Sequence, residues 1–567
     1  MAIHICDKRK AIIDSDANLL VLGGPGSGKT TIALIKANGE IRNIGKNQKI
    51  LFLSFARATV ARVQESASEI IDKESVKLIE INTYHGFFWS ILKSHGYLIN
   101  KVSPIRLIGP ADAAVQMSHL KADEREQEFH KIFIEDGVIG FDLFAVKVKE
   151  IFSKSNRLRN IFSRSYPTII VDEFQDTNTE EWEVIKLLGK KSRIIALADA
   201  DQRIYEFRGA DPARIGQLIT HFEPQSFDFG NENNRSNGTD IITFGNDLLS
   251  GANKGKAYSD VKVVVCPPRK NIHEMYLLKT NALNAIQRLK KQKEWSVAVL
   301  VPTKNQMLMA SNYFSSAANG LPVLNHDVAI DAEGPSLAGA LFSSLMESPE
   351  SAGALLKSII DHVINYTRGR NGSKPPTKAD LNVVMQIEKY LASKKRKPKI
   401  ISEIEAIANA RMGMDLSGNP LSDWLSVIKI FSDRAVHKNL TLLRDDARYV
   451  RLLHKGSRLR ESLSNSWRIN GSYRNAESLY RDAIQQENFS ATVKKFSGIN
   501  IMTIHKSKGK QFDEVFIFEG YMRGRIVSDP KDQNRINQAR LTLRVGVTRA
   551  EKRATILTPS GNPCELL

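Results

Sequence analysis

The segment Gly23–Thr31, with the sequence GGPGSGKTT, constrains the fold of this chain more than any other. It follows the apolar run Leu19–Leu22 and leads into a helical pattern. In such a segment the glycines let consecutive backbone N–H groups converge on phosphate oxygens, and the positive end of the next helix faces the same anion. We predict a phosphate-binding loop for a nucleoside triphosphate, since the flanking strand and helix argue against a chance glycine-rich turn. The predicted nucleotide-binding residues of this loop are Gly23, Gly24, Pro25, Gly26, Ser27, Gly28, Lys29, Thr30 and Thr31.

Side chains of the loop and of a second segment have distinct predicted roles. Lys29 supplies a positive charge to the β- and γ-phosphates, and the Thr30 hydroxyl is a candidate ligand of Mg²⁺. Asp172 and Glu173 follow another apolar run, Thr168–Val171, and the carboxyl ends of parallel strands meet at one edge of a sheet. We therefore expect Asp172 to hold Mg²⁺ through water and Glu173 to polarise the attacking water.

Short apolar strands alternate with helical patterns in two separate series, which predicts an α/β chain with two parallel sheets. A mainly helical region interrupts each series. The first sheet domain is expected over residues 1–86 and 167–229 with a helical insertion at 87–166, and the second over 230–344 and 497–567 with an insertion at 345–496. Gln202, which follows a strand of the first series, is a candidate sensor of the γ-phosphate.

The composition points to a polyanionic partner. The chain carries 81 Lys and Arg residues against 62 Asp and Glu residues, a formal net charge of +19. Lysines and arginines that neutralise phosphates release counterions, although a merely basic soluble protein is the alternative. The three cysteines lie far apart, so neither a disulfide framework nor a metal cluster is expected. A charged N-terminus and the lack of a membrane-spanning apolar run favour a soluble cytoplasmic protein with no membrane partner.

Four further motif blocks occur in a fixed order along the chain. They are VDEFQDTN at 171–178, ADQRIYEFRGA at 200–210, TIHKSKGKQF at 503–512 and VGVTRA at 545–550. Together with the phosphate-binding loop, this set resembles the UvrD/Rep/PcrA-like superfamily 1A DNA helicases. The resemblance implies two RecA-like P-loop domains, each interrupted by a mainly helical insertion, with ATP and Mg²⁺ in the cleft between them. It also implies that Arg235 and Arg549 reach the γ-phosphate from the second domain, and that the chain moves 3′→5′ along DNA.

The same resemblance supplies candidate contacts to single-stranded and junction DNA. Aromatic side chains at such positions stack on bases of any sequence, which suits a motor that must pass every base. The family's strand-binding positions correspond here to Phe55, Arg57, Thr83, His85, Tyr205, Phe207, Arg208 and His505.

At several positions the chain departs from the family pattern. Lys8 stands where the family has a glutamine that recognises adenine, and Gln511 stands at the usual glutamate near the ribose. Phe207 replaces a tryptophan, and Arg544 replaces the tyrosine common before VGVTRA. Because the positions that recognise the nucleoside are altered, we predict relaxed selectivity for the base.

Two functions remain open on the sequence. The leading hypothesis is an ATP-dependent 3′→5′ DNA translocase and helicase that acts in repair, recombination or phage defence. The alternative is a DNA-sensing ATPase subunit that regulates a partner nuclease and unwinds little by itself. The compact build resembles UvrD-like subunits of anti-phage systems such as Gabija, which makes a separate nuclease chain a candidate partner.

Overall fold

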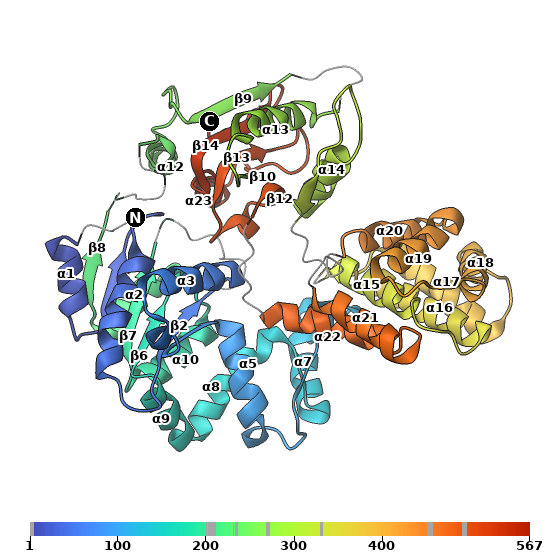
Figure 1. The fold of residues 1–567 in the computed structure, drawn as a ribbon, viewed down its shortest axis with the longest axis horizontal. Coiled ribbons are helices and arrows are strands. Elements are labelled where there is room, and N and C mark those ends of the chain that lie inside the picture. The colour runs from blue at the N-terminus through green and yellow to red at the C-terminus, as the bar shows by residue number, and fades with distance from the viewer. Residues whose placement is uncertain are drawn as a thin grey trace. The chain divides into compact units, whose positions relative to one another are not determined.

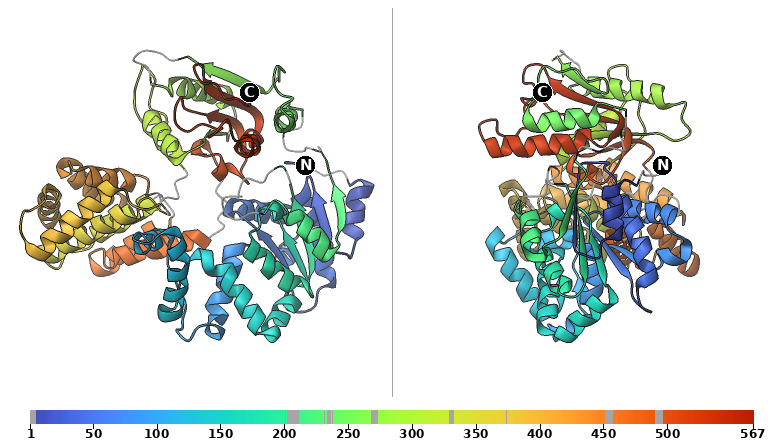
Figure 2. Two further views of the ribbon diagram at one scale, coloured as in Figure 1. Left: turned by 180° about the vertical axis from the view of Figure 1, so that it is seen from behind. Right: turned by 90° about the vertical axis from the view of Figure 1, so that its left-hand side faces the viewer.

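The structure of the protein is a computed structural model, shown as a ribbon in Figure 1 and from two further sides in Figure 2. It describes residues 5–199, 201, 211–230, 232, 236, 238–267, 273–328, 333–372, 374–450, 457–489 and 496–567.

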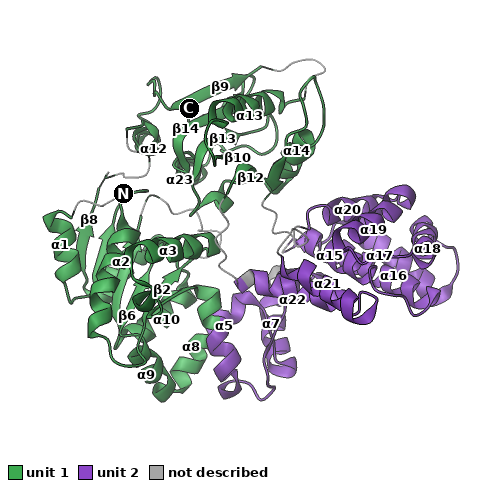
Figure 3. Ribbon diagram, viewed as in Figure 1, with its two compact units in different colours: residues 1–88, 148–329, 491–567 green, residues 89–147, 330–490 purple. Residues whose placement is uncertain are grey.

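The chain divides into two compact units (Figure 3). Unit 1 combines residues 1–88, 148–329 and 491–567, and unit 2 combines residues 89–147 and 330–490. Each unit is therefore built from segments that lie far apart in the sequence.

The first half of unit 1 is a six-stranded sheet in which every pairing is parallel. Its strands lie in the order β3-β2-β6-β7-β1-β8. Their bounds are β1 Leu19–Leu22, β2 Ile50–Ser54, β3 Ile79–Thr83, β6 Thr168–Val171, β7 Arg193–Ala198 and β8 Gln225–Asp228. Parallel strands need crossover connections, and here helices provide them and cover both faces (Figure 2).

Successive side chains along these strands point to opposite faces of the sheet, and both faces are buried. Val21, Phe52 and Ile170 pack in one core cluster with apolar side chains of the helices α2 (Lys29–Glu40) and α3 (Arg57–Ile70). Neighbouring strand residues such as Leu20, Leu51 and Ile169 are equally buried, because they point to the opposite face, which other helices cover. The other helices with all their residues in this half are α1 Asp7–Asp14, α4 Lys73–Val76, α9 Asn156–Ser165, α10 Thr179–Gly189 and α11 Arg214–Phe222.

The second half of unit 1 is another six-stranded parallel sheet, in the order β11-β12-β10-β13-β14-β9. The strands are β9 Val261–Cys266, β10 Ser296–Val301, β11 His326–Val328, β12 Gly498–Thr503, β13 Phe512–Phe518 and β14 Ala550–Pro559. The helices are α12 Ile241–Ser250, α13 Tyr276–Leu289, α14 Lys304–Phe314 and α23 Gln533–Val547. We call residues 5–88 and 148–230 lobe 1, and residues 236–328 and 496–567 lobe 2.

Unit 2 is mainly helical, with one short parallel pair, β4 (Arg106–Leu107) and β5 (Val138–Ile139). Its helices are α6 Pro110–Gln116, α7 Ala122–Asp136, α15 Glu333–Ser344, α16 Ala352–Gly369, α17 Lys378–Ser393, α18 Lys399–Met412, α19 Pro420–Arg434, α20 Lys438–Ala447, α21 Arg458–Asn470 and α22 Ala476–Phe489. Two more helices, α5 (Tyr84–His95) and α8 (Phe144–Lys154), contribute residues to both units. A single apolar cluster joins the helices of the later segment and includes Ala111 of α6.

The fold confirms the predicted α/β class with two parallel sheets and many helices. The predicted boundaries of four separate domains stay a prediction. Two edge strands, β8 and β11, were not expected from the sequence, because their polar residues give no apolar run. Among the described residues, no helix combines the length and the apolar character needed to cross a membrane.

Candidate nucleotide-binding and hydrolysis site

The carboxyl edge of the first sheet brings the predicted motifs together. Ser54 at the end of β2 is paired with Thr83 at the end of β3, and Val171 at the end of β6 is paired with Ala196 of β7. On the other side of β7, Leu22 of β1 is paired with Ala198. The segments that follow these strands therefore leave the sheet in one row. Along this row the candidate DNA contacts come first, the carboxylates stand in the middle and the glycine-rich loop follows.

The glycine-rich loop connects β1 directly to α2. Gly28 caps the N-terminus of α2 with φ 90°, and Gly26 has φ 78°, so both occupy the left-handed region that favours glycine. A side-chain hydrogen bond also shapes the loop: the Ser27 hydroxyl donates to Gly24 O at 2.9 Å. The result is a tight turn that ends at a helix N-terminus, the arrangement that binds phosphate groups.

Lys29 is the first residue of α2, and its side chain turns back over the loop. Its Nζ atom donates to the carbonyl oxygens of Gly23 at 2.5 Å and of Gly24 at 3.1 Å. The ammonium group is thus held at the mouth of the loop, where it can meet a phosphate. Thr30 and Thr31 lie beside it in the first turn of the helix.

Asp172 and Glu173 come directly after β6. The Asp172 N–H donates to Leu53 O at 2.9 Å, which continues the pairing of β6 with β2. Glu173 has φ 53° and ψ 40°, a left-handed conformation that is uncommon for a residue with a side chain and is found at functional sites. The chain therefore turns sharply here and presents two successive carboxylates at the edge of the sheet.

The surroundings of these two carboxylates push their pKa values apart. Burial raises the pKa of Asp172 to about 6, and the adjacent charge of Glu173 adds to the rise. Burial also acts to raise the pKa of Glu173, but the charges of Lys508 and Lys29 outweigh it and lower that pKa to about 2. Glu173 is thus ionised over the whole range in which the protein is expected to work.

Lys508 of lobe 2 lies among the carboxylates of lobe 1. Its Nζ is 3.3 Å from Glu173 Oε2 and forms a close ion pair with Asp176, and it is almost fully buried. Burial raises the pKa of Asp176 to about 7, which Lys508 only partly counters. A second lobe-2 residue, Arg549, is fully buried, and its Nε donates to Val545 O at 2.9 Å.

The charge of Arg549 also acts on the carboxylate site. Burial lowers the pKa of its guanidinium to about 10, and the neighbouring carboxylate of Glu173 works in the opposite direction. Arg62 of α3 adds a cation from lobe 1, since its charge acts to lower the pKa of Asp172. The buried Nη1 of Arg62 has no hydrogen-bond partner in the part of the chain that the structure describes.

The oxygen donors at the loop fit Mg²⁺ bound to a nucleotide. Mg²⁺ usually takes one or two protein oxygens and completes its shell with phosphates and water, so a cage made only of protein is not required. Thr30 supplies a hydroxyl and Asp172 a carboxylate. The described residues contain no group of three or more His, Cys, Asp or Glu side chains that could hold a metal by themselves.

In the described part of lobe 1, four candidate DNA contacts lie at the other end of the same row. Phe55 follows β2 and Arg57 begins α3, both half-buried. Thr83 ends β3, and its hydroxyl accepts a hydrogen bond from Gly86 N at 3.0 Å. His85 is the second residue of α5. In lobe 2, His505 follows β12, and burial, with the charge of Lys508, lowers its pKa.

Several predicted residues lie outside the described residues. They are Gln202, Tyr205, Phe207, Arg208 and Arg235. Gln511 is half-buried and immediately precedes β13. The next residue, Phe512, is hydrogen-bonded to Arg549, because its N–H donates to Arg549 O at 3.0 Å.

Sequence reasoning assigned no role to several charged residues of the site. Lys508 lies within TIHKSKGKQF, Asp176 lies within VDEFQDTN, and Asp199 follows β7. Arg62 has no motif signal. The missing information is which groups face each other, since Lys508 and Asp176 are 332 residues apart.

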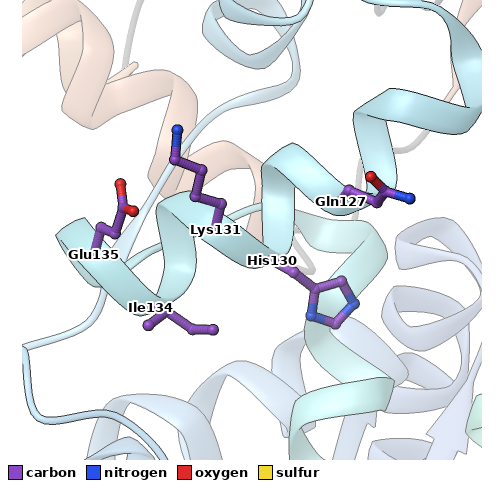
Figure 4. A pocket seen from close by; sticks show the side chains of 5 residues that line it. All are labelled: Gln127, His130, Lys131, Ile134 and Glu135. Carbon is purple, nitrogen blue, oxygen red and sulfur yellow. The ribbon is translucent and has the colours of Figure 1, made fainter.

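A separate hollow of about 470 Å³ lies on α7, lined by Gln127, His130, Lys131, Ile134 and Glu135 (Figure 4). All five residues come from one helix of unit 2, and none belongs to the motifs above.

Comparison with known proteins identifies two family domains in the chain. The UvrD/REP helicase N-terminal domain matches residues 6–133 and 116–223, and the UvrD-like helicase C-terminal domain matches residues 383–560.

Individual relatives are similar over different lengths. A putative ATP-dependent DNA helicase, YjcD of Bacillus subtilis, is 25% identical over 253 residues, which are 37% of this chain and 33% of that protein. A probable DNA helicase II homolog of Rickettsia conorii is 21% identical over 96% of this chain and 91% of its own length. The ATP-dependent DNA helicase Rep of Buchnera aphidicola is 21% identical over 96% of this chain and 93% of its own length.

Proposed function

The chain belongs to the UvrD/Rep family of helicases, and from this membership we propose that it is an ATP-driven motor that moves 3′→5′ on single-stranded DNA and unwinds duplexes. Its proposed cofactor is Mg²⁺, and its proposed substrates are single-stranded and junction DNA. The observation that carries the proposal is the row of motif segments at the carboxyl edge of the first sheet, in which the candidate strand contacts adjoin the candidate hydrolytic carboxylates.

The residues of lobe 1 would bind and activate the nucleotide. The loop Gly23–Gly28 offers backbone N–H groups to the phosphates, and Lys29 adds a positive charge to them. Glu173, ionised because Lys508 and Lys29 lower its pKa, would accept a hydrogen bond from the attacking water and orient it toward the γ-phosphate. A bound Mg²⁺, held by Thr30 and Asp172, would neutralise charge on the phosphates.

Lobe 2 would complete the site. Arg549 is buried close enough to Glu173 for the two charges to interact, so its guanidinium can stabilise the charge that develops on the transferred phosphoryl group. Because Arg549 and Lys508 belong to lobe 2, hydrolysis would depend on the approach of the two lobes. Repeated approach and separation would step the candidate strand contacts of each lobe along DNA.

The test is the ATPase rate of the wild type and of Glu173→Gln, each with and without single-stranded DNA. We expect strong stimulation by DNA in the wild type and loss of turnover in the variant, with nucleotide binding kept. The proposal is rejected if DNA does not change the ATPase rate of the wild type, or if the Glu173→Gln variant hydrolyses ATP at the wild-type rate.

Unwinding assays then separate direction and alternatives. Duplexes with a single-stranded tail at only the 3′ or only the 5′ end give the direction, and a 3′→5′ motor opens only the first. DNA-stimulated hydrolysis without unwinding on either substrate would instead favour the sensor subunit that regulates a partner nuclease.

A further inference from the structure

Arg544 lies at the contact between the two lobes. It is near the end of α23, its side chain is 97% buried, and its Nη2 donates to Asn246 Oδ1 of α12 at 3.1 Å. The helices α12 and α23 contact each other within lobe 2, so this hydrogen bond fixes the guanidinium on its own lobe.

The opposite edge of the guanidinium faces lobe 1. Its Nη1 is 3.5 Å from Asp199 Oδ2 and donates to Asp201 O at 3.3 Å. The same group lies against the glycine-rich loop, because a Cβ atom placed on Gly24 would be 3.7 Å from Nη2. Arg544 thus touches the segment after β7 and approaches the loop after β1, two neighbouring strands of the first sheet.

The hydrogen bonds of this arginine are incomplete. Its Nε is buried and has no acceptor among the residues that the structure describes. Asp199 does not serve Arg544 alone, since its Oδ1 accepts a hydrogen bond from Asp201 N at 3.0 Å. A buried guanidinium with an unused donor next to a phosphate-binding loop fits an additional anion, because its fork of N–H groups matches phosphate oxygens.

We propose that Arg544 is a further nucleotide-binding residue, which contacts the phosphate chain beside Gly24 from lobe 2. The inference rests on the proposed function and adds a residue to its site. Arg544 is distinct from Arg549 in role: Arg544 binds the phosphate chain in the ground state and sets affinity, whereas Arg549 acts on the charge that develops during transfer.

The test is isothermal titration of wild type and variants with ATPγS and with ADP. Arg544→Gln removes the charge but keeps a polar side chain, and we expect it to weaken ATPγS binding about tenfold or more, as for the loss of a charge-assisted hydrogen bond. Arg544→Lys keeps the charge without the fork and should weaken binding by a smaller factor.

Arg540→Gln is the matched control. Arg540 lies one turn earlier on α23, and its Nη1 donates to Leu249 O at 2.8 Å within lobe 2. We expect this variant to bind ATPγS within about twofold of the wild type, as for a surface change away from the ligand.

The outcomes separate the inference from the function on which it rests. ATPγS affinity of Arg544→Gln and Arg544→Lys equal to that of Arg540→Gln, with a lowered thermal midpoint, would show that Arg544 only ties the lobes together and would overturn the inference. If Arg544→Gln does not fold, the Arg544→Lys comparison decides. A wild type that binds ATPγS but shows no DNA-stimulated hydrolysis would reject the proposed motor. The titrations would then still decide whether Arg544 binds the nucleotide.

Discussion

The two lobes of unit 1 share a sheet architecture but differ in the charges that they bring to the site. Lobe 1 supplies the glycine-rich loop with Lys29, the half-buried carboxylate of Glu173, and the buried carboxylates Asp172, Asp176 and Asp199. Lobe 2 supplies buried cations, namely Lys508, Arg544 and Arg549. The contacts between these groups include Lys508 with Glu173 at 3.3 Å and Arg544 with Asp199 at 3.5 Å.

On the proposed function, this division means that neither lobe completes the site by itself. A buried charge without a partner is costly, so the lobe-2 cations stabilise the lobe-1 carboxylates in addition to Lys29 and Arg62 of lobe 1. A nucleotide brings negative phosphates toward the cations and a magnesium ion toward the carboxylates. On the proposed function, binding and hydrolysis would therefore change the balance of charge between the lobes and could move one lobe against the other.

The strongest test of lobe 1 is Lys29→Ala. The variant loses the side-chain cation that Gly23 O and Gly24 O hold over the loop. We expect turnover to fall below detection, because the terminal phosphates lose their charge partner at the loop. ATPase assays at saturating DNA measure the effect, and undiminished turnover would contradict the phosphate-loop assignment.

The corresponding test of lobe 2 is Arg549→Ala. We expect turnover to fall about 10³-fold or more, the usual effect of removing an arginine that stabilises the transferred phosphoryl group. Nucleotide affinity should change little, since the loop and Lys29 remain. The kcat and KM of ATP hydrolysis separate the two effects, and a change confined to KM would remove Arg549 from this role.

The strands that position the site can be predicted from the sequence. The apolar runs Leu19–Leu22 and Thr168–Val171 coincide with β1 and β6, because strands buried on both faces are continuous apolar runs. The edge strand Gln225–Asp228 contains a single apolar residue, Phe227, and becomes a strand only through its pairing with β1. Its strand character is tertiary, and local sequence gives no signal for it.

The site was predictable to the same extent. Lys29, Asp172 and Glu173 are fixed by local motifs and by the position of the strands before them, so their location at the sheet edge follows from the sequence. The partner of Lys508 does not, because the pairing depends on how two separate sheets face each other. The perturbed pKa of Glu173 arises from that pairing, and no periodicity in the chain encodes it.

A smaller effect is expected for Lys508→Met, which removes one cation from between the lobes. Without it, the pKa of Glu173 should rise from about 2, and Asp176 loses its ion pair. We expect turnover at neutral pH to fall about ten- to a hundredfold, less than for Arg549→Ala, because the general base remains in place. The ATPase rate at fixed pH and saturating ATP measures this.

The pH profile of the same variant identifies the cause. Glu173 acts as a carboxylate, so a pKa near 2 keeps it active as the pH falls, and a raised pKa moves its loss of activity to higher pH. In Lys508→Met, the acidic limb of the kcat–pH profile should therefore shift to higher pH. The control is Lys552→Met, because Lys552 is half-exposed and pairs with Asp513 inside lobe 2. An unshifted limb would mean that Lys508 does not control Glu173.

The smallest effect concerns how closely the lobes approach. Gly509 of lobe 2 has φ 78°, and a Cβ atom added there would lie 2.3 Å from Thr59 Oγ1 on α3 of lobe 1. Gly509→Ala should combine left-handed strain with a clash between the lobes. We expect a loss of about 1–3 kcal/mol in stability, within the usual range for a strained substitution, and a severalfold fall in DNA-stimulated ATPase.

Gly498→Ala provides the control, since Gly498 has a similar φ of 68° but a Cβ atom there would meet nothing within 4 Å. Backbone strain alone would make the two alanine variants equal in thermal midpoint and in ATPase rate. If the close approach of the lobes matters, Gly509→Ala must be the worse of the two, and adding Thr59→Ala must restore part of the ATPase, because it removes the hydroxyl that the new methyl group meets. Equal defects that Thr59→Ala does not relieve would show that the lobes need not come this close for hydrolysis, which would confine their coupling to the charges.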